Sequence, residues 1–358
     1  MENKIPFVSV VIPMFNSAKF ISQTLESLLY QTLKDFEVVV VDDCSTDNSV
    51  AVVENFAKKF GGRLNVIKLA KNTGTPGLPR NIGIQMSRGK YVAFLDSDDL
   101  FTKTALEHLT TLAERFQADV VHLQNNFILW GGNERAVDDP AMTDFAALTN
   151  PKNFSVQSYR NERLRESTLE SQDISVRVRK WLATAPNSFW ATWLLFYRRE
   201  FLITNQIFFS GMTTCEDAPV AFEALCTAKN YLNAPAAVNI IRPRSGSVSR
   251  EDFNTTDYFA KRVRALNDGF NEFERVMKKI NFFAENPNYR YAVLDWFANF
   301  RISVTLNFYS KIPPFKLNEL VKEELDGATF AAYLFNTAST QRIQIMQLQR
   351  ELAALKKA

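Results

Sequence analysis

The sequence predicts an α/β protein, with a mostly parallel sheet flanked by helices, followed by an α-helical C-terminal region. Short β-branched runs alternate with amphipathic segments through residues 5–125, a pattern typical of a parallel sheet covered on both faces. Polar clusters follow three of the predicted strands, where ligands bind in sheets of this kind. The chain has 358 residues, too many for one ordinary core, so we expect more than one domain.

The first two predicted strands are each followed by a predicted helix. Residues 7–12 and 37–41 are short, apolar and β-branched, as buried strands are. A segment with one apolar face follows each run, with Ser17 and then Ser45 or Thr46 as candidate helix caps. The apolar faces are Phe20, Ile21, Leu25, Leu28 and Leu29 in the first helix, and Val50, Val53, Phe56, Ala57 and Phe60 in the second.

The alternation continues through the next segments. Residues 65–69 and 91–95 are predicted as strands, separated by a Gly- and Pro-rich loop at 72–79 and a short helix at 81–87. Another helix follows, and residues 120–123 begin a further strand. The apolar face of that helix consists of Leu106, Leu109, Leu112 and Phe116.

The pattern breaks over residues 131–185, which are polar, mixed in charge and poor in apolar periodicity. We therefore expect an insertion or a mobile loop there. Regular structure is predicted again at 190–205, as a helix at 217–229 and as a strand at 237–241.

The C-terminal third is predicted to be helical. Residues 252–335 are rich in aromatic side chains without strand alternation, and those at 289–311 are compatible with a peripheral membrane contact. The last residues, 337–358, predict a short coiled coil that would join copies of the chain into a homo-oligomer. Its seam consists of Ile345, Leu348, Leu352 and Leu355.

Composition excludes several classes of function. A net charge of +3 is too weak for a dedicated nucleic-acid binder. Three cysteines without paired spacing argue against structural zinc or a disulfide framework, and two histidines leave acid–base chemistry to carboxylates. No apolar run reaches the roughly 18 residues that cross a bilayer, and the N-terminus has no signal-peptide core. We expect a cytoplasmic protein, at most peripheral at the cytoplasmic membrane face.

The fourth predicted strand ends in Asp96-Ser97-Asp98-Asp99. Carboxylates this close repel one another unless a cation lies between them, and hard divalent cations prefer oxygen ligands. A Mg²⁺ or Mn²⁺ ion held there would bridge to a diphosphate and neutralise its charge as it leaves. Aspartate is also common in turns and helix caps, so the motif alone leaves a metal site and a turn open.

Two more polar segments lie near predicted strand ends. Asp42, next to Asp43, can accept hydrogen bonds from a ribose or a base, or cap the following helix. The loop that begins at Asn72 contains Gly74, whose backbone can approach a ligand closely, and leads to Arg80 at a helix start. An arginine there suits a phosphate or nucleotide, although an exposed loop with a surface arginine fits the pattern as well.

Two downstream segments complete the candidate set. Glu216-Asp217 precedes an apolar-faced helix, where Asp217 is either an N-cap or a general base presented at a helix start. The basic loop that holds Arg242, Arg244 and Ser245 can close over a diphosphate or an anionic acceptor, or be a solvated turn.

Taken in order, these segments resemble the family 2 inverting glycosyltransferases of the GT-A fold, whose sheet is Rossmann-like. The resemblance covers residues 7–250. The loop that leads into Pro79-Arg80-Asn81 is most similar to wall teichoic acid glycosyltransferases, which attach N-acetylglucosamine to polyribitol phosphate. The matching segments are Val8 to Asn16, Val41 to Asp47, Pro79 to Gly83, Phe94 to Asp99, Tyr197 to Leu202, Glu216-Asp217, and Arg242 to Ser249.

The resemblance implies domains and residue roles. Residues 1–250 would be the catalytic domain, with a nucleotide-binding half at about 5–125 and an acceptor half at about 126–250; a helical appendage (251–336) and the coil would follow. The family more often has tyrosine where Phe15 stands. The implied roles are donor binding for Pro13, Phe15, Asn16, Asp42, Asn72, Gly74, Arg80 and Asp96, metal binding for Asp96 and Asp98, catalytic base for Asp217 with Glu216 orienting substrate, and diphosphate or acceptor binding for Arg242, Arg244 and Ser245.

The leading hypothesis is metal-assisted transfer of a sugar, with inversion, from a UDP-sugar to a hydroxyl of a cell-surface polysaccharide, teichoic-acid-like polymer or other glycan. A sugar-1-phosphate nucleotidyltransferase would need a glycine- and arginine-rich loop after the first strand, where Pro13-Met14-Phe15-Asn16 stands. A catalytically inactive module that binds a nucleotide-sugar or a glycan is the third alternative.

Overall fold

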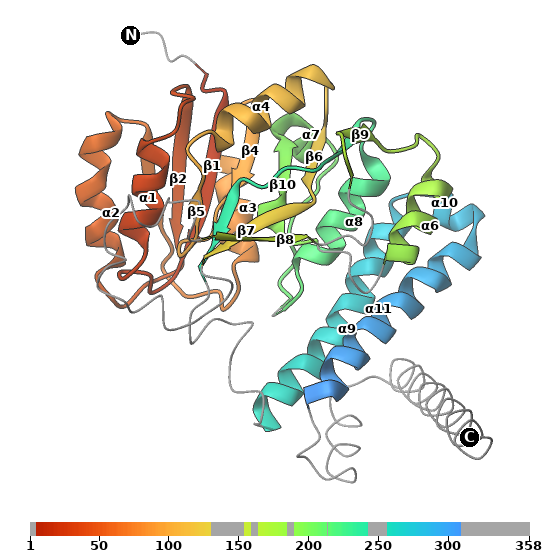
Figure 1. Cartoon of the computed structure of the whole chain (residues 1–358). Helices are drawn as coiled ribbons and strands as arrows, with labels where there is room; N and C mark the ends of the chain where they lie inside the picture. The colour runs from red at the N-terminus through yellow and green to blue at the C-terminus, as the bar shows by residue number, and fades with distance from the viewer. Residues whose placement is uncertain are drawn as a thin grey trace, which may run out of the picture. The chain divides into compact units, whose positions relative to one another are not determined.

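The computed structural model of the chain describes residues 5–129, 154–158, 164–184, 190–212, 214–242 and 256–308. The chain divides into two compact units, residues 1–249 and 250–358. The first unit contains the sheets (Figure 1), and every site residue predicted from the sequence falls within its range. The described part of the second unit is helical.

A mixed sheet of eight strands forms the centre of the first unit. In spatial order these are β3 (Leu64–Lys68), β2 (Phe36–Asp42), β1 (Val8–Met14), β4 (Tyr91–Phe94), β10 (Leu195–Arg198), β6 (Val120–Leu123), β11 (Tyr231–Ala234) and β9 (Thr168–Leu169). The first four strands are mutually parallel, and β6 is parallel to β11. β10 runs antiparallel to both its neighbours, as β9 does to β11. The predicted mostly parallel α/β sheet is therefore confirmed.

Helices cover both faces of the parallel half of this sheet (Figure 1). They are α1 (Ile21–Leu29), α2 (Ser49–Ala57), α3 (Gly77–Met86) and α4 (Ala105–Arg115). Val10 and Ile12 of β1 belong to one apolar cluster with α1, α2 and α4. Val11 points the other way because side chains alternate along a strand, and it lies against α3. All three valine and isoleucine side chains are fully buried, which explains the unbroken apolar sequence of this strand.

Gly83 allows α3 to lie close to β1. A Cβ atom at this position would come within 2.2 Å of Val11 Cγ1, and the buried, β-branched valine has little freedom to turn away. We expect Gly83→Ala to lower the free energy of unfolding by about 2 kcal/mol, although alanine is the better helix former. Urea unfolding measures the loss, with Gly211→Ala as control, because a Cβ at Gly211 meets nothing within 4 Å. Equal stability of the two variants would contradict this packing argument.

A second, four-stranded sheet brings two of the predicted site segments together. Its order is β5 (Leu100–Phe101), β12 (Asn239–Ile241), β7 (Asn125–Leu129) and β8 (Phe154–Ser158). β5 follows the acidic segment at Asp96 to Asp99 directly, and β12 leads into Arg242. Because β5 and β12 pair antiparallel, the acidic segment lies next to the start of the basic loop.

Of the two alternatives predicted for 131–185, a mobile loop is wrong for the described part, and an insertion stays a prediction. That part contains β8, β9 at the edge of the main sheet, and the helix α6 (Ile174–Thr184). Val178 and Trp181 of α6 are buried, and so is Arg177, whose guanidinium donates to backbone carbonyls near the end of α8 (Asp217–Thr227). The apolar face was missed because a buried arginine and neighbouring charges interrupt it.

The predicted cap residues instead join the loops at the strand ends. Neither α1 nor α2 has a side-chain cap hydrogen bond, so Ser17, Ser45 and Thr46 are not caps. The hydroxyls of Ser17 and Ser97 share a hydrogen bond of 2.6 Å, and Ser45 Oγ accepts from the backbone N–H of Asn16 at 2.9 Å. The loops after β1, β2 and β4 are therefore tied to one another.

The described part of the second unit consists of α9 (Thr256–Lys278), α10 (Asn281–Glu285) and α11 (Pro287–Phe308). α9 and α11 pack closely, since a Cβ at Gly269 would lie 2.1 Å from the Phe297 ring. The helical prediction is confirmed for the described residues 256–308, and the predicted coiled coil at 337–358 lies outside the described residues. Within the described ranges, no helix has both the length and the apolar character needed to cross a membrane.

Candidate active site

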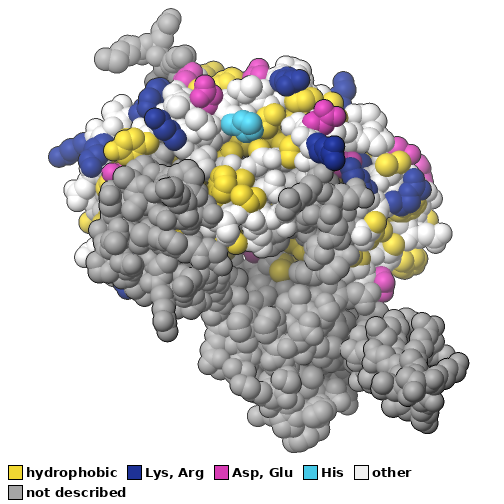
Figure 2. Space-filling view, in the orientation of Figure 1, with side chains coloured by type: hydrophobic (Ala, Val, Ile, Leu, Met, Phe, Trp, Pro, Cys, Tyr) yellow, Lys and Arg dark blue, Asp and Glu magenta, His cyan; other side chains and the backbone are white. Residues whose placement is uncertain are grey.

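Surface charges of both signs are interspersed on the described part of the face in Figure 2, among apolar side chains. This arrangement gives that face no single sign of charge with which to steer a ligand. A much denser group of charges lies around Arg80, whose side chain is only 4% exposed.

Arg80 lies in the first turn of α3. The helix begins at Gly77, four residues before the predicted start, because proline at position 79 fits a first helical turn as well as it fits a loop. The side chain is therefore held inside the protein rather than on the surface. Its guanidinium lies over the ring of Phe209, 5.4 Å from the ring centroid, a cation–π contact.

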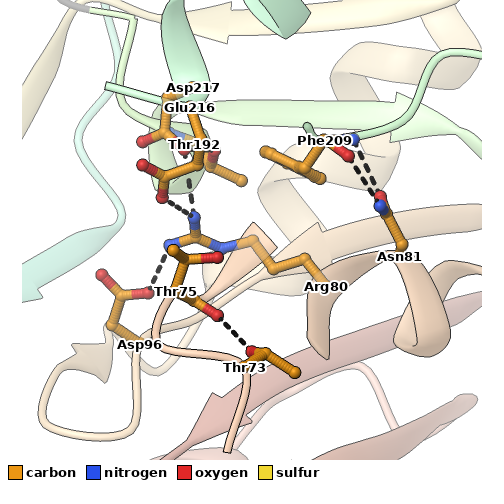
Figure 3. A network of polar contacts seen from close by, with 9 residues as sticks. All are labelled: Thr73, Thr75, Arg80, Asn81, Asp96, Thr192, Phe209, Glu216 and Asp217. Carbon is orange, nitrogen blue, oxygen red and sulfur yellow. Dashed lines mark hydrogen bonds and ion pairs between the residues drawn. The ribbon is translucent and has the colours of Figure 1, made fainter. Parts of the chain in front are cut away.

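Three carboxylates converge on the Arg80 guanidinium (Figure 3). Its Nη1 donates to Glu216 Oε1 at 2.9 Å and to Asp217 Oδ1 at 3.0 Å, and its Nη2 donates to Asp96 Oδ1 at 3.0 Å. Asp96 follows β4, whereas Glu216 and Asp217 lie at the start of α8, so the fold brings together two motifs that are far apart in the sequence. One side chain links the acidic segment to the predicted catalytic pair.

Burial dominates the electrostatics of this network. It raises the pKa of Glu216 to about 7, a shift that the charge of Asp217 reinforces and Arg80 opposes. Burial also raises the pKa of Asp96, against the opposing charge of Arg80 and with a contribution from Asp98. Although burial disfavours the Arg80 cation, the three carboxylates outweigh it and raise the arginine pKa. The guanidinium is thus a fixed positive charge beside two carboxyl groups, those of Glu216 and Asp96, whose pKa values are raised.

Asp217 is the first residue of α8, and it is not the N-cap that one interpretation of the sequence suggested. Glu216 holds the N-cap position, without a side-chain cap hydrogen bond. The Asp217 carboxylate is instead engaged by Thr192, whose hydroxyl donates to Oδ1 at 2.6 Å and whose backbone N–H donates to Oδ2 at 3.2 Å. Thr192 could not be found from the sequence, since a threonine beside a strand carries no motif of its own.

The last residue of β2, Asp42, has an unsatisfied carboxylate oxygen. Asp42 is 3% exposed; its Oδ2 accepts from the backbone N–H of Ser45 at 3.2 Å, while its buried Oδ1 has no hydrogen-bond partner among the described residues. Asn16, in the left-handed region at φ 47°, accepts from the Thr46 N–H at 2.8 Å. Pro13 is buried within β1. Phe15, which directly precedes Asn16 in the sequence, is 46% exposed.

The loop after β3 is shaped by its own polar groups. Both carboxylate oxygens of Asp43 accept from Thr73, at 2.9 and 3.0 Å. Asn72 donates to the Asp43 carbonyl at 3.0 Å and accepts from the Gly74 N–H at 2.7 Å. Gly74 has a φ of 76°, which favours glycine. Asn72 and Gly74 therefore fix the path of the loop that leads to Arg80.

Arg242 donates hydrogen bonds to the acidic segment at Asp96 to Asp99. This buried residue donates its backbone N–H to Asp99 Oδ1 at 2.9 Å, its Nε to the carbonyl of Asp98, and its Nη2 to Thr24 Oγ1 at 3.1 Å. Its guanidinium is thus built into the fold, unlike the solvated loop side chain that we considered. Arg244 and Ser245 lie outside the described residues.

Asp96 and Asp98 have the chemistry of a divalent-cation site. Both are partly exposed, and the charge of Asp98 raises the pKa of Asp96, so the two carboxylates interact. Among the described residues, no three His, Cys, Asp or Glu side chains are placed to hold a metal ion by themselves. The pair fits an ion whose remaining ligands are phosphate oxygens and water, as is common for Mg²⁺.

Comparison with known proteins identifies the segment that contains Asp42, Arg80, Asp96 and Asp98. The sequence model described as Glycosyl transferase family 2 matches residues 9–180, from β1 to α6. Residues 9–180 belong to glycosyl transferase family 2. This family 2 segment includes Asp42, Arg80, Asp96 and Asp98, and the resemblance inferred from the sequence is confirmed.

Two curated glycosyltransferases illustrate the relationship of the chain to other proteins. It is 30% identical over 246 residues to the uncharacterized glycosyltransferase EpsJ of Bacillus subtilis (strain 168), an alignment that covers 68% of the chain and 63% of EpsJ. It is 32% identical over 228 residues to the poly(ribitol-phosphate) beta-N-acetylglucosaminyltransferase TarS of Staphylococcus aureus (strain MW2), covering 63% of the chain and 32% of TarS. The chain therefore spans only part of the length of these relatives.

Solved structures extend the likeness to the fold. The crystal structure of S. aureus TarS 1–349 superposes with a TM-score of 0.61 and 20% identity, covering 94% of this chain and 91% of that one. The same TarS fragment in complex with UDP-GlcNAc gives a TM-score of 0.57 and 22% identity, covering 94% and 92%. The chain thus has the GT-A fold that its sequence predicted.

Proposed function

We propose that this protein is an inverting glycosyltransferase that moves a sugar from a UDP-sugar to a hydroxyl of a cell-surface polysaccharide, teichoic-acid-like polymer or other glycan. The observation that carries the proposal is the convergence of Asp96 and Asp217 on the buried guanidinium of Arg80. Inverting transfer needs a base for the acceptor hydroxyl and positive charge near the leaving diphosphate. Asp217, the proposed base, and Asp96, proposed to lie on the donor side, contact different nitrogens of this one guanidinium.

The proposed reaction is a single displacement. Asp217 takes the proton of the acceptor hydroxyl while that oxygen attacks the anomeric carbon, and the bond from this carbon to the diphosphate breaks on the opposite side. One such displacement inverts the configuration. Glu216, whose pKa of about 7 allows it to donate or accept a hydrogen bond near neutral pH, orients the acceptor beside the base. Asp96 and Asp98 would hold a divalent cation, which would neutralise the charge that builds on the leaving diphosphate.

The donor and acceptor classes rest on the named relatives. TarS is named as a poly(ribitol-phosphate) beta-N-acetylglucosaminyltransferase, and its fragment has been crystallised with UDP-GlcNAc. We extend to this chain a UDP-sugar donor and a polyol-phosphate or glycan acceptor. Oligomerisation through residues 337–358, peripheral membrane contact, and acceptor or diphosphate roles for Arg242, Arg244 and Ser245 stay predictions.

A donor screen tests the proposal. The full chain is incubated with Mn²⁺, poly(ribitol phosphate) and, in turn, UDP-GlcNAc, UDP-glucose, UDP-galactose and GDP-mannose, while released nucleotide and product mass are measured. We expect UDP release with one of the UDP-sugars, its loss after chelation with EDTA, and its return with Mn²⁺. Pyrophosphate release from UTP and a sugar 1-phosphate would instead support a nucleotidyltransferase. If a donor binds but none of these conditions gives turnover, the result would support the catalytically inactive binding module.

Asp42 provides a separate test of donor binding. We expect Asp42→Asn to weaken the binding of UDP about tenfold, because the buried Oδ1 needs a donor and Oδ2 already accepts from Ser45. An amide has only one accepting end, so one of the two positions is lost whichever way the side chain lies. Isothermal titration measures UDP affinity, and the thermal unfolding temperature serves as a control for folding. Wild-type UDP affinity in the variant would remove Asp42 from the donor site.

A further inference from the structure

Thr192 makes two contacts with the proposed base that no motif of the sequence signals. It opens the 3₁₀ turn η6 (Thr192–Leu194), directly before β10, and is 1% exposed. Its Oγ1–H donates to Asp217 Oδ1 at 2.6 Å, within the short range of hydrogen bonds from a hydroxyl to an ionised carboxylate. Its backbone N–H donates to Oδ2 of the same carboxylate at 3.2 Å. One residue thus contacts both oxygens of the base, as Figure 3 shows for the side chain.

The Thr192 backbone is itself held firmly. Leu194, at the end of the turn, is fully buried and donates its N–H to the Ala191 carbonyl at 2.9 Å. The Asn239 side chain of β12 donates to the Trp193 carbonyl at 2.6 Å. The chain then enters β10, which pairs with strands on both sides. A group carried on such a rigid segment can fix a neighbouring carboxylate without reorganising during the reaction.

We propose that Thr192 is a positioning residue, which fixes the plane of the Asp217 carboxylate and leaves Oδ2 as the oxygen that takes the acceptor proton. Each carboxylate oxygen has two lone-pair directions. Oδ1 accepts from Arg80 Nη1 and from Thr192 Oγ1, which fills both of its directions. Oδ2 accepts the longer bond from the Thr192 N–H and keeps one direction for a substrate hydroxyl. The inference rests on the proposed role of Asp217.

In the proposed step, proton transfer to Asp217 Oδ2 is coupled to the making and breaking of the bonds at the anomeric carbon. The acceptor O–H bond breaks as Oδ2 takes the proton, and the freed oxygen lone pair forms the new bond to the anomeric carbon. The electron pair of the old bond leaves with the nucleoside diphosphate. Because Oδ1 keeps its two charge-assisted donors throughout, the carboxylate does not rotate while Oδ2 reacts.

Thr192→Val and Thr192→Ser separate this role from packing. Valine keeps the shape of threonine and the backbone N–H but removes the hydroxyl, whereas serine keeps the hydroxyl and removes a methyl group. With UDP-GlcNAc, poly(ribitol phosphate) and Mn²⁺ as the probe reaction, we expect Thr192→Val to lower kcat about tenfold, with the KM for UDP-GlcNAc within about twofold of wild type. Thr192→Ser should keep at least about half of the wild-type kcat. Thr192→Ala, which lacks the hydroxyl and needs no added space, should behave as valine does.

The double variant tests whether Thr192 acts through Asp217. Asp217→Asn alone should be nearly inactive, and adding Thr192→Val should lower the residual rate no further, since the oriented group is already disabled. Equal kcat in the valine and serine variants, or a further tenfold loss in the double variant, would overturn the positioning role. Near-normal turnover of Asp217→Asn would instead overturn the base assignment itself. If Asp217→Asn is inactive but Thr192→Val has the wild-type kcat, the positioning role of Thr192 is refuted and the base assignment of Asp217 is not.

Discussion

Asp217→Asn is expected to lower the rate of sugar transfer about a thousandfold while leaving UDP affinity within about twofold of wild type. The amide oxygen can still accept from Arg80 Nη1 and from the Thr192 hydroxyl, and only the longer bond from the Thr192 backbone N–H is lost, because an amide NH2 cannot accept. The amide cannot take a proton at the acceptor hydroxyl, and the loss therefore falls on kcat. Initial rates of UDP release measure turnover, and isothermal titration with UDP measures binding.

Two comparisons make the Asp217 result specific. Glu54→Gln removes a carboxylate from an ion pair with Lys68 whose two side chains are each 54% exposed, and it should keep wild-type rates. Glu216→Gln keeps a side chain able to accept from Arg80, so a smaller loss there than at position 217 is expected if Glu216 orients substrate. If Asp217→Asn retained more than about a tenth of the wild-type rate, another group would have to act as the base.

The sequence predicted the parallel half of the sheet because one physical signal dominates there. Val38 to Val41 of β2 are fully buried, and a strand buried on both faces gives an unbroken apolar run. β11 gave no such signal, since its four residues include Asn233, a fully buried polar side chain that donates to Glu170. The antiparallel direction of β10 was also beyond prediction, because strand direction depends on neighbours far away in the sequence.

Some residues of the candidate site could likewise be predicted from the sequence, and others could not. Asp42, Asp96, Asp98 and the Glu216-Asp217 pair could be found because strand ends and helix starts are recognisable from local pattern. The burial of Arg80 could not be found, since the carboxylates that stabilise its charge come from two other segments. Thr192 could not be predicted for the same reason, because its role depends on two contacts with a residue 25 positions away.

Arg80→Met is expected to lower the free energy of unfolding by about 3 to 5 kcal/mol at pH 8, and to abolish transfer. Methionine fills similar space but leaves Asp96, Glu216 and Asp217 without the cation that all three contact. Removing one partner of a buried ion pair is costly because the remaining charge is neither solvated nor compensated. Arg80→Lys should lie between wild type and methionine, since one ammonium group cannot bridge three carboxylates as the planar guanidinium does.

The pH dependence of this loss identifies its cause. Without Arg80, the pKa of Glu216 rises above its present value of about 7, and that of Asp96 rises as well. An acid whose pKa is higher in the folded than in the unfolded protein binds more protons when folded, so stability falls as pH rises from about 4.3 through the folded pKa. The difference between Arg80→Met and wild type should therefore be larger at pH 8 than at pH 5 in urea unfolding. A difference that stays constant over this range would mean that lost packing, rather than uncompensated charge, destabilises the variant.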